Sequence, residues 1–160
     1  MGKRIYDSKD NFGGYFEDFS VGDVYKHWPG KTITESDNHL FSLITMNTSP
    51  LHIDENYMLG HQHGQILVCG PLVLSLVVGM SVSDTSGKAV ANLEYESIKH
   101  FGPVFIGDTI YSESQILACD LTRSKKRGII FMETIGLNQK DEKIINLKRR
   151  FLVPVRPDGV

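Results

Sequence analysis

The chain has 160 residues, of which 41% are hydrophobic and 22% are charged, and its formal net charge at pH 7 is −2. This size and composition are typical of a single globular domain with a substantial core. The nearly balanced charge gives no electrostatic reason to expect binding to nucleic acid or to an anionic membrane surface.

The cysteines and the apolar runs indicate the cellular compartment in which the protein is expected. Cys69 and Cys119 lie far apart in apolar surroundings and form no CxxC pair, which predicts free thiols in a reducing compartment rather than a zinc site or a disulfide. No apolar signal core precedes residue 17, and the run 66–80 is too short to span a bilayer. We therefore expect a cytoplasmic protein that does not enter the membrane.

The N-terminal part is expected to form a loosely ordered arm over residues 1–14, followed by one domain over residues 15–160. The first strand is predicted at about residues 24–32, with an interruption at Trp28-Pro29-Gly30. We expect the side chain of His27, within this strand, to be partly exposed.

Helical patterns follow the first strand. Thr34 or Ser36 can cap a helix whose first turn contains Asp37, a charge that suits the positive end of the helix dipole. A short second helix is predicted at residues 54–58. Pro71 is typical of a first helical turn and opens an apolar helix that should be buried on most sides.

After Gly87 the pattern changes to long strands separated by turn residues. Four strands are predicted, at residues 89–100, 108–121, 128–139 and 143–153. One strand, then helices including an apolar one, then four strands favours an antiparallel sheet wrapped around a central helix, in the α+β class.

The segment 47–52 carries the clearest chemical signal. Histidine has an unperturbed pKa of about 6.5, so His52 can give or take a proton near neutral pH. Pro50 disfavours a helical conformation at Ser49, so a turn is expected to aim His52 into a cleft. Gly70 begins the apolar helix, where free backbone N–H groups can stabilise an oxyanion.

Structural interpretations remain open for several of these residues. His52 can be a hydrogen-bonded core histidine, and Asn47 can cap the end of a helix. Asp37 is expected to be a first-turn helix charge rather than a catalytic acid. His61 and His63 share a loop at a spacing that suits a metal, but no third ligand is in view, and we expect no metal site.

Basic residues cluster at Arg123-Ser124-Lys125-Lys126-Arg127 and at Lys148-Arg149-Arg150. The simplest interpretation is a solvated turn and a strand end. The functional alternative is an anchor for the phosphates of a ligand.

An ordered set of motifs resembles the MaoC-like, (R)-specific enoyl-CoA hydratase family. The set covers residues 15–154 and comprises Phe16 to Asp23, Thr32 to Asp37 followed by Phe41, Pro50-Leu51-His52, Val68-Cys69-Gly70 and Pro103 to Thr109. The resemblance implies a hotdog fold, in which an antiparallel sheet wraps a long helix, and a homodimer or a higher homo-oligomer with sites near the interface.

The resemblance also implies the chemistry. The family motif Gly-Asp-x-Asn-Pro-Leu-His uses its Asp and His to activate the water that adds to an enoyl thioester, and its oxyanion donor falls at Gly70. Here the His is His52, but Asn47 replaces the Asp, Met46 the Gly and Ser49 the Asn. An amide cannot accept a proton as a carboxylate does.

The implied function is hydration of a 2-enoyl-CoA, or dehydration of a 3-hydroxyacyl-CoA, with branched and dicarboxylic acyl groups among the candidates. His52 and Asn47 are the expected catalytic residues, and Gly70, Cys69 and Ser49 the substrate-binding ones. Arg123, Lys125 and Arg127 are the candidates for the CoA phosphates. No cofactor is expected beyond the coenzyme A of the substrate. The alternatives are a non-catalytic acyl-CoA-binding protein and an acyl-CoA thioesterase.

Overall fold

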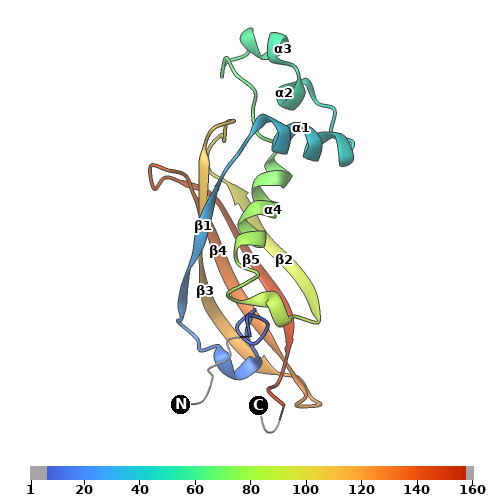
Figure 1. Cartoon of the computed structure of the whole chain (residues 1–160), viewed down its shortest axis with the longest axis vertical. Coiled ribbons are helices and arrows are strands. Elements are labelled where there is room, and N and C mark those ends of the chain that lie inside the picture. Colours follow the sequence, from blue (N-terminus) through green and yellow to red (C-terminus); the bar gives the residue numbers. More distant parts are fainter. Residues whose placement is uncertain (1–6, 158–160) are drawn as a thin grey trace.

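A curved, five-stranded antiparallel sheet forms the body of the protein in the computed structural model, which describes residues 7–157 (Figure 1). Its order is β1-β3-β4-β5-β2, so β1 and β2 are the edge strands. The strands are β1 (Val24–Thr32), β2 (Ala91–His100), β3 (Thr109–Leu121), β4 (Arg127–Leu137) and β5 (Lys143–Pro154). All five were predicted from the sequence, to within two residues at each end.

The helices divide into two groups. The apolar helix α4 (Gly70–Met80) lies along one face of the sheet and contacts β1, β3 and β4 (Figure 1). The others, α1 (Glu35–Ile44), α2 (Pro50–Ile53) and α3 (Glu55–Leu59), gather beyond the first turn of α4. The α+β arrangement predicted from the sequence is confirmed.

The core lies between α4 and the sheet. Val73 and Val77 of α4 are buried against Ile110, Ile145 and Leu147 of the strands. Burial alternates along β4, which is the pattern of a strand with one face on the core. Burying this apolar helix fixes its first turn at one end of the sheet, next to α1 and α2.

The expectation of a partly exposed His27 was wrong, because its side chain is fully buried. Its Nδ1 lies 2.8 Å from Oδ2 of Asp84, and its Nε2 lies 2.8 Å from Oγ of Ser114. The β1–β3 register shifts between His27 and Lys31, at the predicted interruption. His27 comes just before this irregularity and faces the α4 side, where two polar partners satisfy it.

The described part of the expected N-terminal arm is attached to a short 3-10 helix, η2 (Ser86–Lys88). Nζ of Lys88 donates to the carbonyls of Asp10, Phe12 and Gly13, at 3.0, 2.9 and 2.9 Å. The backbone N–H of Gly13 also donates to the carbonyl of Ser83. Another 3-10 turn, η1 (Phe16–Asp18), leads into the sheet. Residues 1–6 of the expected arm lie outside the described residues.

Within residues 7–157, no helix combines the length and the apolar character needed to cross a bilayer.

Candidate active site

The first turn of α1 is fixed by a capping box. Thr34 Oγ1 accepts from the N–H of Asp37, and Asp37 Oδ2 accepts from the N–H of Thr34 at 2.8 Å. Nζ of Lys31 lies 2.7 Å from the same carboxylate oxygen. The hydrogen bond from Lys31, together with those from Thr34, lowers the pKa of Asp37 from 3.8 to about 2. Asp37 is therefore a helix-capping charge, as predicted.

The end of α1 places Asn47. The N–H of Asn47 donates to the carbonyl of Ser42 at 2.8 Å, and that of Met46 to Leu43 at 3.1 Å, which is the Schellman pattern. Met46 has a positive φ of 59°, in the position where glycine is most common. Glycine adopts a positive φ without strain, which explains why the family motif has a glycine at the position of Met46.

The side chain of Asn47 does not cap α1. Its Nδ2 donates to Sγ of the buried Cys69 at 3.2 Å, and its Oδ1 accepts from the N–H of Ser49 at 3.4 Å. The predicted residues Asn47, Ser49 and Cys69 are therefore brought together just before α4.

His52 lies on α2, a one-turn helix that the sequence analysis did not predict. Ser49 is extended, with φ −59° and ψ 131°, and Pro50 begins the helix. His52 is half-buried, and its Nδ1 lies 2.9 Å from the carbonyl of Leu67. A carbonyl can only accept, so Nδ1 carries the proton and Nε2 of the neutral ring is left as an acceptor.

Asn38 of α1 connects the two halves of the site, and sequence reasoning missed it. It is fully buried, its Nδ2 donates to the carbonyl of His52 at 2.8 Å, and its Oδ1 accepts from the N–H of Cys69 at 2.9 Å. A polar residue on the buried face of an amphipathic helix was the available signal. Asn38 ties the helix that carries His52 to the residue preceding Gly70.

Gly70 lies at the first position of α4. Its backbone N–H donates no hydrogen bond to any described residue. A Cβ at this position would lie 3.3 Å from Cε1 of His100, so the ring of His100 lies directly against Gly70. The site thus combines one free N–H, the acceptor nitrogen of His52 and the amide of Asn47.

The basic residues Arg123, Lys125 and Arg127 are not brought to this site within one chain. They follow β3, whose first residue lies near α1 and whose 13 residues extend for about 43 Å. Figure 1 shows the β3–β4 connection at the end of the sheet opposite to α1, α2 and α3.

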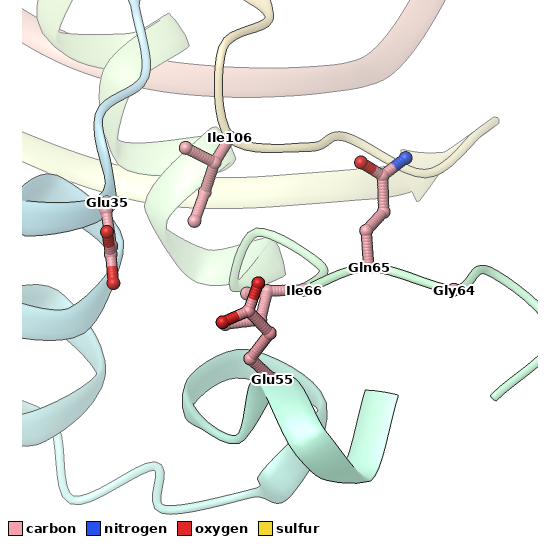
Figure 2. A pocket seen from close by; sticks show the side chains of 6 residues that line it. All are labelled: Glu35, Glu55, Gly64, Gln65, Ile66 and Ile106. Atoms are coloured by element: carbon pink, nitrogen blue, oxygen red, sulfur yellow. The ribbon is translucent and has the colours of Figure 1, made fainter. Parts of the chain in front are cut away.

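A cavity of about 250 Å³ lies beside the site. Figure 2 shows its lining, which comes from the start of α1, from α3, and from the segments before α4 and β3: Glu35, Glu55, Gly64, Gln65, Ile66 and Ile106. Its lining contains two carboxylates and no basic side chain, so it disfavours phosphates and acyl carboxylates.

The rings of His61 and His63 lie 5.4 Å apart, and His63 packs against Phe105. Among the described residues, no three His, Cys, Asp or Glu side chains are grouped so that they could hold a metal.

Comparisons with known proteins identify the family. The family model described as the MaoC like domain matches residues 18–136. The chain is 29% identical to beta-methylmalyl-CoA dehydratase of Chloroflexus aurantiacus, over 93% of this chain and 42% of that protein. It is 28% identical to mesaconyl-CoA hydratase of Cereibacter sphaeroides, over 92% of this chain and 43% of that protein.

Solved structures agree. A putative MaoC domain protein dehydratase from Chloroflexus aurantiacus superposes with a TM-score of 0.84 and 29% identity, over 94% of this chain and 43% of that one. A Mycobacterium tuberculosis protein described as having a double hotdog fold gives a TM-score of 0.83 at 22% identity, over 92% of this chain and 46% of that one.

The antiparallel sheet and its buried helix together define a hotdog fold. The chain belongs to the MaoC-like domain family, as the motifs predicted. It spans less than half the length of the two curated relatives described above.

Proposed function

We propose that this protein is a hydro-lyase that adds water to a 2-enoyl-CoA thioester, or removes it from the 3-hydroxyacyl-CoA. The observation that carries the proposal is the hydrogen bond from Nδ1 of His52 to the carbonyl of Leu67. It fixes the tautomer in which Nε2 can accept a proton, near an unpaired N–H at Gly70.

In the proposed reaction the thioester oxygen accepts a hydrogen bond from Gly70 N–H. Nε2 of His52 takes a proton from water as the oxygen of that water bonds to the β-carbon and the C=C π bond breaks. The resulting enolate is stabilised at Gly70 by the N–H and by the positive end of α4. The proton then moves from His52 to the α-carbon, and the reverse sequence is dehydration.

Asn47 would orient the water without exchanging a proton. Its amide is held by Cys69 and Ser49, so it is pre-positioned beside the helix that carries His52. Without a carboxylate here, we expect turnover to be about 10²–10⁴ times slower than with two acid/base groups.

The acyl group is proposed to carry a carboxylate. The two relatives described above are named for methylmalyl-CoA and mesaconyl-CoA. An amide in place of a carboxylate at position 47 avoids placing two negative charges together. An enoyl group without a carboxylate gains nothing from that substitution.

A homodimer, or a larger homo-oligomer, is part of the proposal. β2 is an edge strand whose residues are exposed on both faces in the single chain, including Leu93, Tyr95 and Ile98. Such an edge is a template for pairing with another chain. Two curated relatives are more than twice as long as the matching segment, which is consistent with two such units working together.

The dimer also gives the basic cluster a role. If two β2 strands pair antiparallel, the Ala91 end of one lies beside the His100 end of the other. Arg127 pairs with Pro154 at the Ala91 end of its own sheet. The cluster of one subunit is therefore proposed to approach the CoA phosphates bound at the other subunit's site. A cytoplasmic location remains proposed as well, supported by Cys69 and Cys119 being free thiols.

The second candidate is a non-catalytic acyl-CoA-binding protein, which the neutral amide of Asn47 favours. A thioesterase has less support. Residues 70–80 contain no carboxylate, and Asp84 interacts with His27 rather than with the start of α4.

A substrate panel separates these functions. Crotonyl-CoA and mesaconyl-CoA would be followed by loss of the enoyl-thioester absorbance, and free thiol would be titrated in parallel with a disulfide reagent. The proposal expects absorbance loss without thiol release. Thiol release at the same rate would indicate a thioesterase. Saturable binding of the thioesters in calorimetry without either signal would indicate the binding protein.

A further inference from the structure

The ring of His100 lies against the start of α4 and has no assigned role. Nε2 of His100 is 3.4 Å from where a Cβ of Gly70 would be, and Cε1 is 3.3 Å from it. A Cβ position lies about 2.5 Å from its own backbone nitrogen, so Nε2 lies within roughly 6 Å of Gly70 N. His100 therefore faces the surroundings of the N–H that is proposed to bind the thioester oxygen.

This imidazole is available to a ligand. His100 is the last residue of β2 and is exposed, and its ring makes no hydrogen bond or ion pair with any residue in the described range 7–157. By contrast, Nδ1 of His52 is already bound to Leu67, and both ring nitrogens of the buried His27 are occupied.

The charge around the site is mixed, because Glu35 and Glu55 line the neighbouring cavity whereas a cation and a helix N-terminus lie near His100. Among the described residues, no ion pair includes His52 or His100, and no carboxylate is hydrogen-bonded to Asn47, His52 or His100. Nζ of Lys143 lies 4.8 Å above the ring of Phe101, the residue after His100. The positive end of α4 adds to this field.

We propose that His100 is a specificity-determining residue that donates a hydrogen bond from its ring to a carboxylate on the acyl group of the thioester. This inference rests on the proposed function and deepens it, because it names the side chain that selects an anionic acyl-CoA over a neutral one. The spacing is suitable, since the acyl group begins at the thioester carbon beside Gly70.

The test measures binding without requiring turnover. Succinyl-CoA and butyryl-CoA, which have the same number of acyl carbons and differ by one carboxylate, would be titrated calorimetrically into the wild-type protein. The variants are His100→Phe, which keeps an aromatic ring against Gly70 but no donor, and His100→Gln, which keeps a donor. Lys99→Ala is the matched control, because it removes a cation on the opposite face of the same strand.

We expect wild type to prefer succinyl-CoA, and His100→Phe to weaken succinyl-CoA binding about 10- to 100-fold, as for a lost hydrogen bond to a charged group. Butyryl-CoA binding should change less than about 3-fold, His100→Gln should retain part of the preference, and Lys99→Ala should retain it. Equal losses for both thioesters in His100→Phe, or none, overturn this inference while the proposed hydratase stands if wild type still hydrates crotonyl-CoA. Absence of both thioester binding and hydration in wild type overturns both proposals.

Discussion

Asn47 is the residue at which this site departs most from the hydratase motif that it resembles. Its amide bridges Cys69 and Ser49 and offers a water two kinds of hydrogen bond but no proton exchange. The proposed chemistry therefore depends on the imidazole of His52 for proton transfer. At the same time the neutral amide leaves room for a negatively charged acyl group.

Replacing Asn47 by Asp should change the two substrate classes in opposite directions. A second acid/base group should raise kcat/KM for crotonyl-CoA about 10-fold or more. The same charge should lower kcat/KM for mesaconyl-CoA, because two carboxylates would be close together. Steady-state kinetics of wild type, Asn47→Asp and Asn47→Ala would check this, with Asn47→Ala expected to be slower on both. Parallel changes of Asn47→Asp on both substrates would contradict the account.

At the scale of single residues, the motif at residues 47–52 could be predicted from the sequence, but the long-range contacts of the site could not. Asn47, Ser49 and His52 lie within six residues, so the turn that unites them follows from the sequence. Asn38 acts through partners 14 and 31 residues away, and His100 approaches Gly70 only because β2 ends there. Helical periodicity can place Asn38 on the buried face of α1, but it does not identify the distant partners of such contacts.

Helix α1 carries much of the site, since its first turn is anchored to β1 and its last turn places Asn47. The anchor is Asp37, which accepts from Thr34 and Lys31. Its pKa is lowered from 3.8 to about 2, chiefly by the hydrogen bond from Lys31 and then by those from Thr34. A carboxyl with a lowered pKa stabilises the fold above its unfolded-state pKa, and this contribution is lost as the pH falls through about 2.

Asp37→Asn should therefore lower the free energy of unfolding at pH 7 by about 1 kcal/mol, a value typical of a lost cap. The difference from wild type should shrink between the unfolded-state pKa near 3.8 and the folded-state pKa of about 2. Urea denaturation at neutral and acidic pH measures it. Glu35→Gln, in the same turn, is the control and should show a smaller difference. A difference for Asp37→Asn that persists unchanged at the lowest pH would refute the capping role.

Some helices and strands were easier to predict from the sequence than others. β4, most of β3 and the second half of β5 alternate in burial, and all three strands are bounded by turn residues, so their limits were predictable. The four-residue α2 was not, because it is held by tertiary bonds such as Leu67 N–H to the carbonyl of Leu51. His27 was misjudged because its burial depends on partners in β3 and beyond α4, and its own strand gives no sign of them.

β2 is one of the two edge strands of the sheet, and in the single chain its side chains are exposed along nearly its whole length. β2 contains apolar residues that are nearly half exposed, with Leu93 at 48%, Tyr95 at 46% and Ile98 at 40%. His100 ends this same strand. Assembly through β2 would therefore also enclose the region next to the proposed substrate site.

A charge on this edge should dissociate the protein. Ile98→Lys would place an ammonium group among the apolar residues of a β2–β2 interface, which disfavours pairing. Sedimentation equilibrium should show a dimer or larger species for wild type and mainly monomer for Ile98→Lys. Ile44→Lys, at an exposed position on α1, should leave the assembly unchanged. If wild type is monomeric, or if Ile44→Lys disrupts the assembly and Ile98→Lys does not, β2 is not the interface.

The proposed mechanism joins the acceptor nitrogen of His52 to the backbone N–H of Gly70, which donates to no described residue. The most direct measurement is kcat/KM for enoyl-CoA hydration by wild type and His52→Ala, with His63→Ala as the control. The account predicts that His52→Ala is slower by about 10²-fold or more, while His63→Ala stays near wild type. Measurable hydration at equal rates in wild type and folded His52→Ala would contradict it.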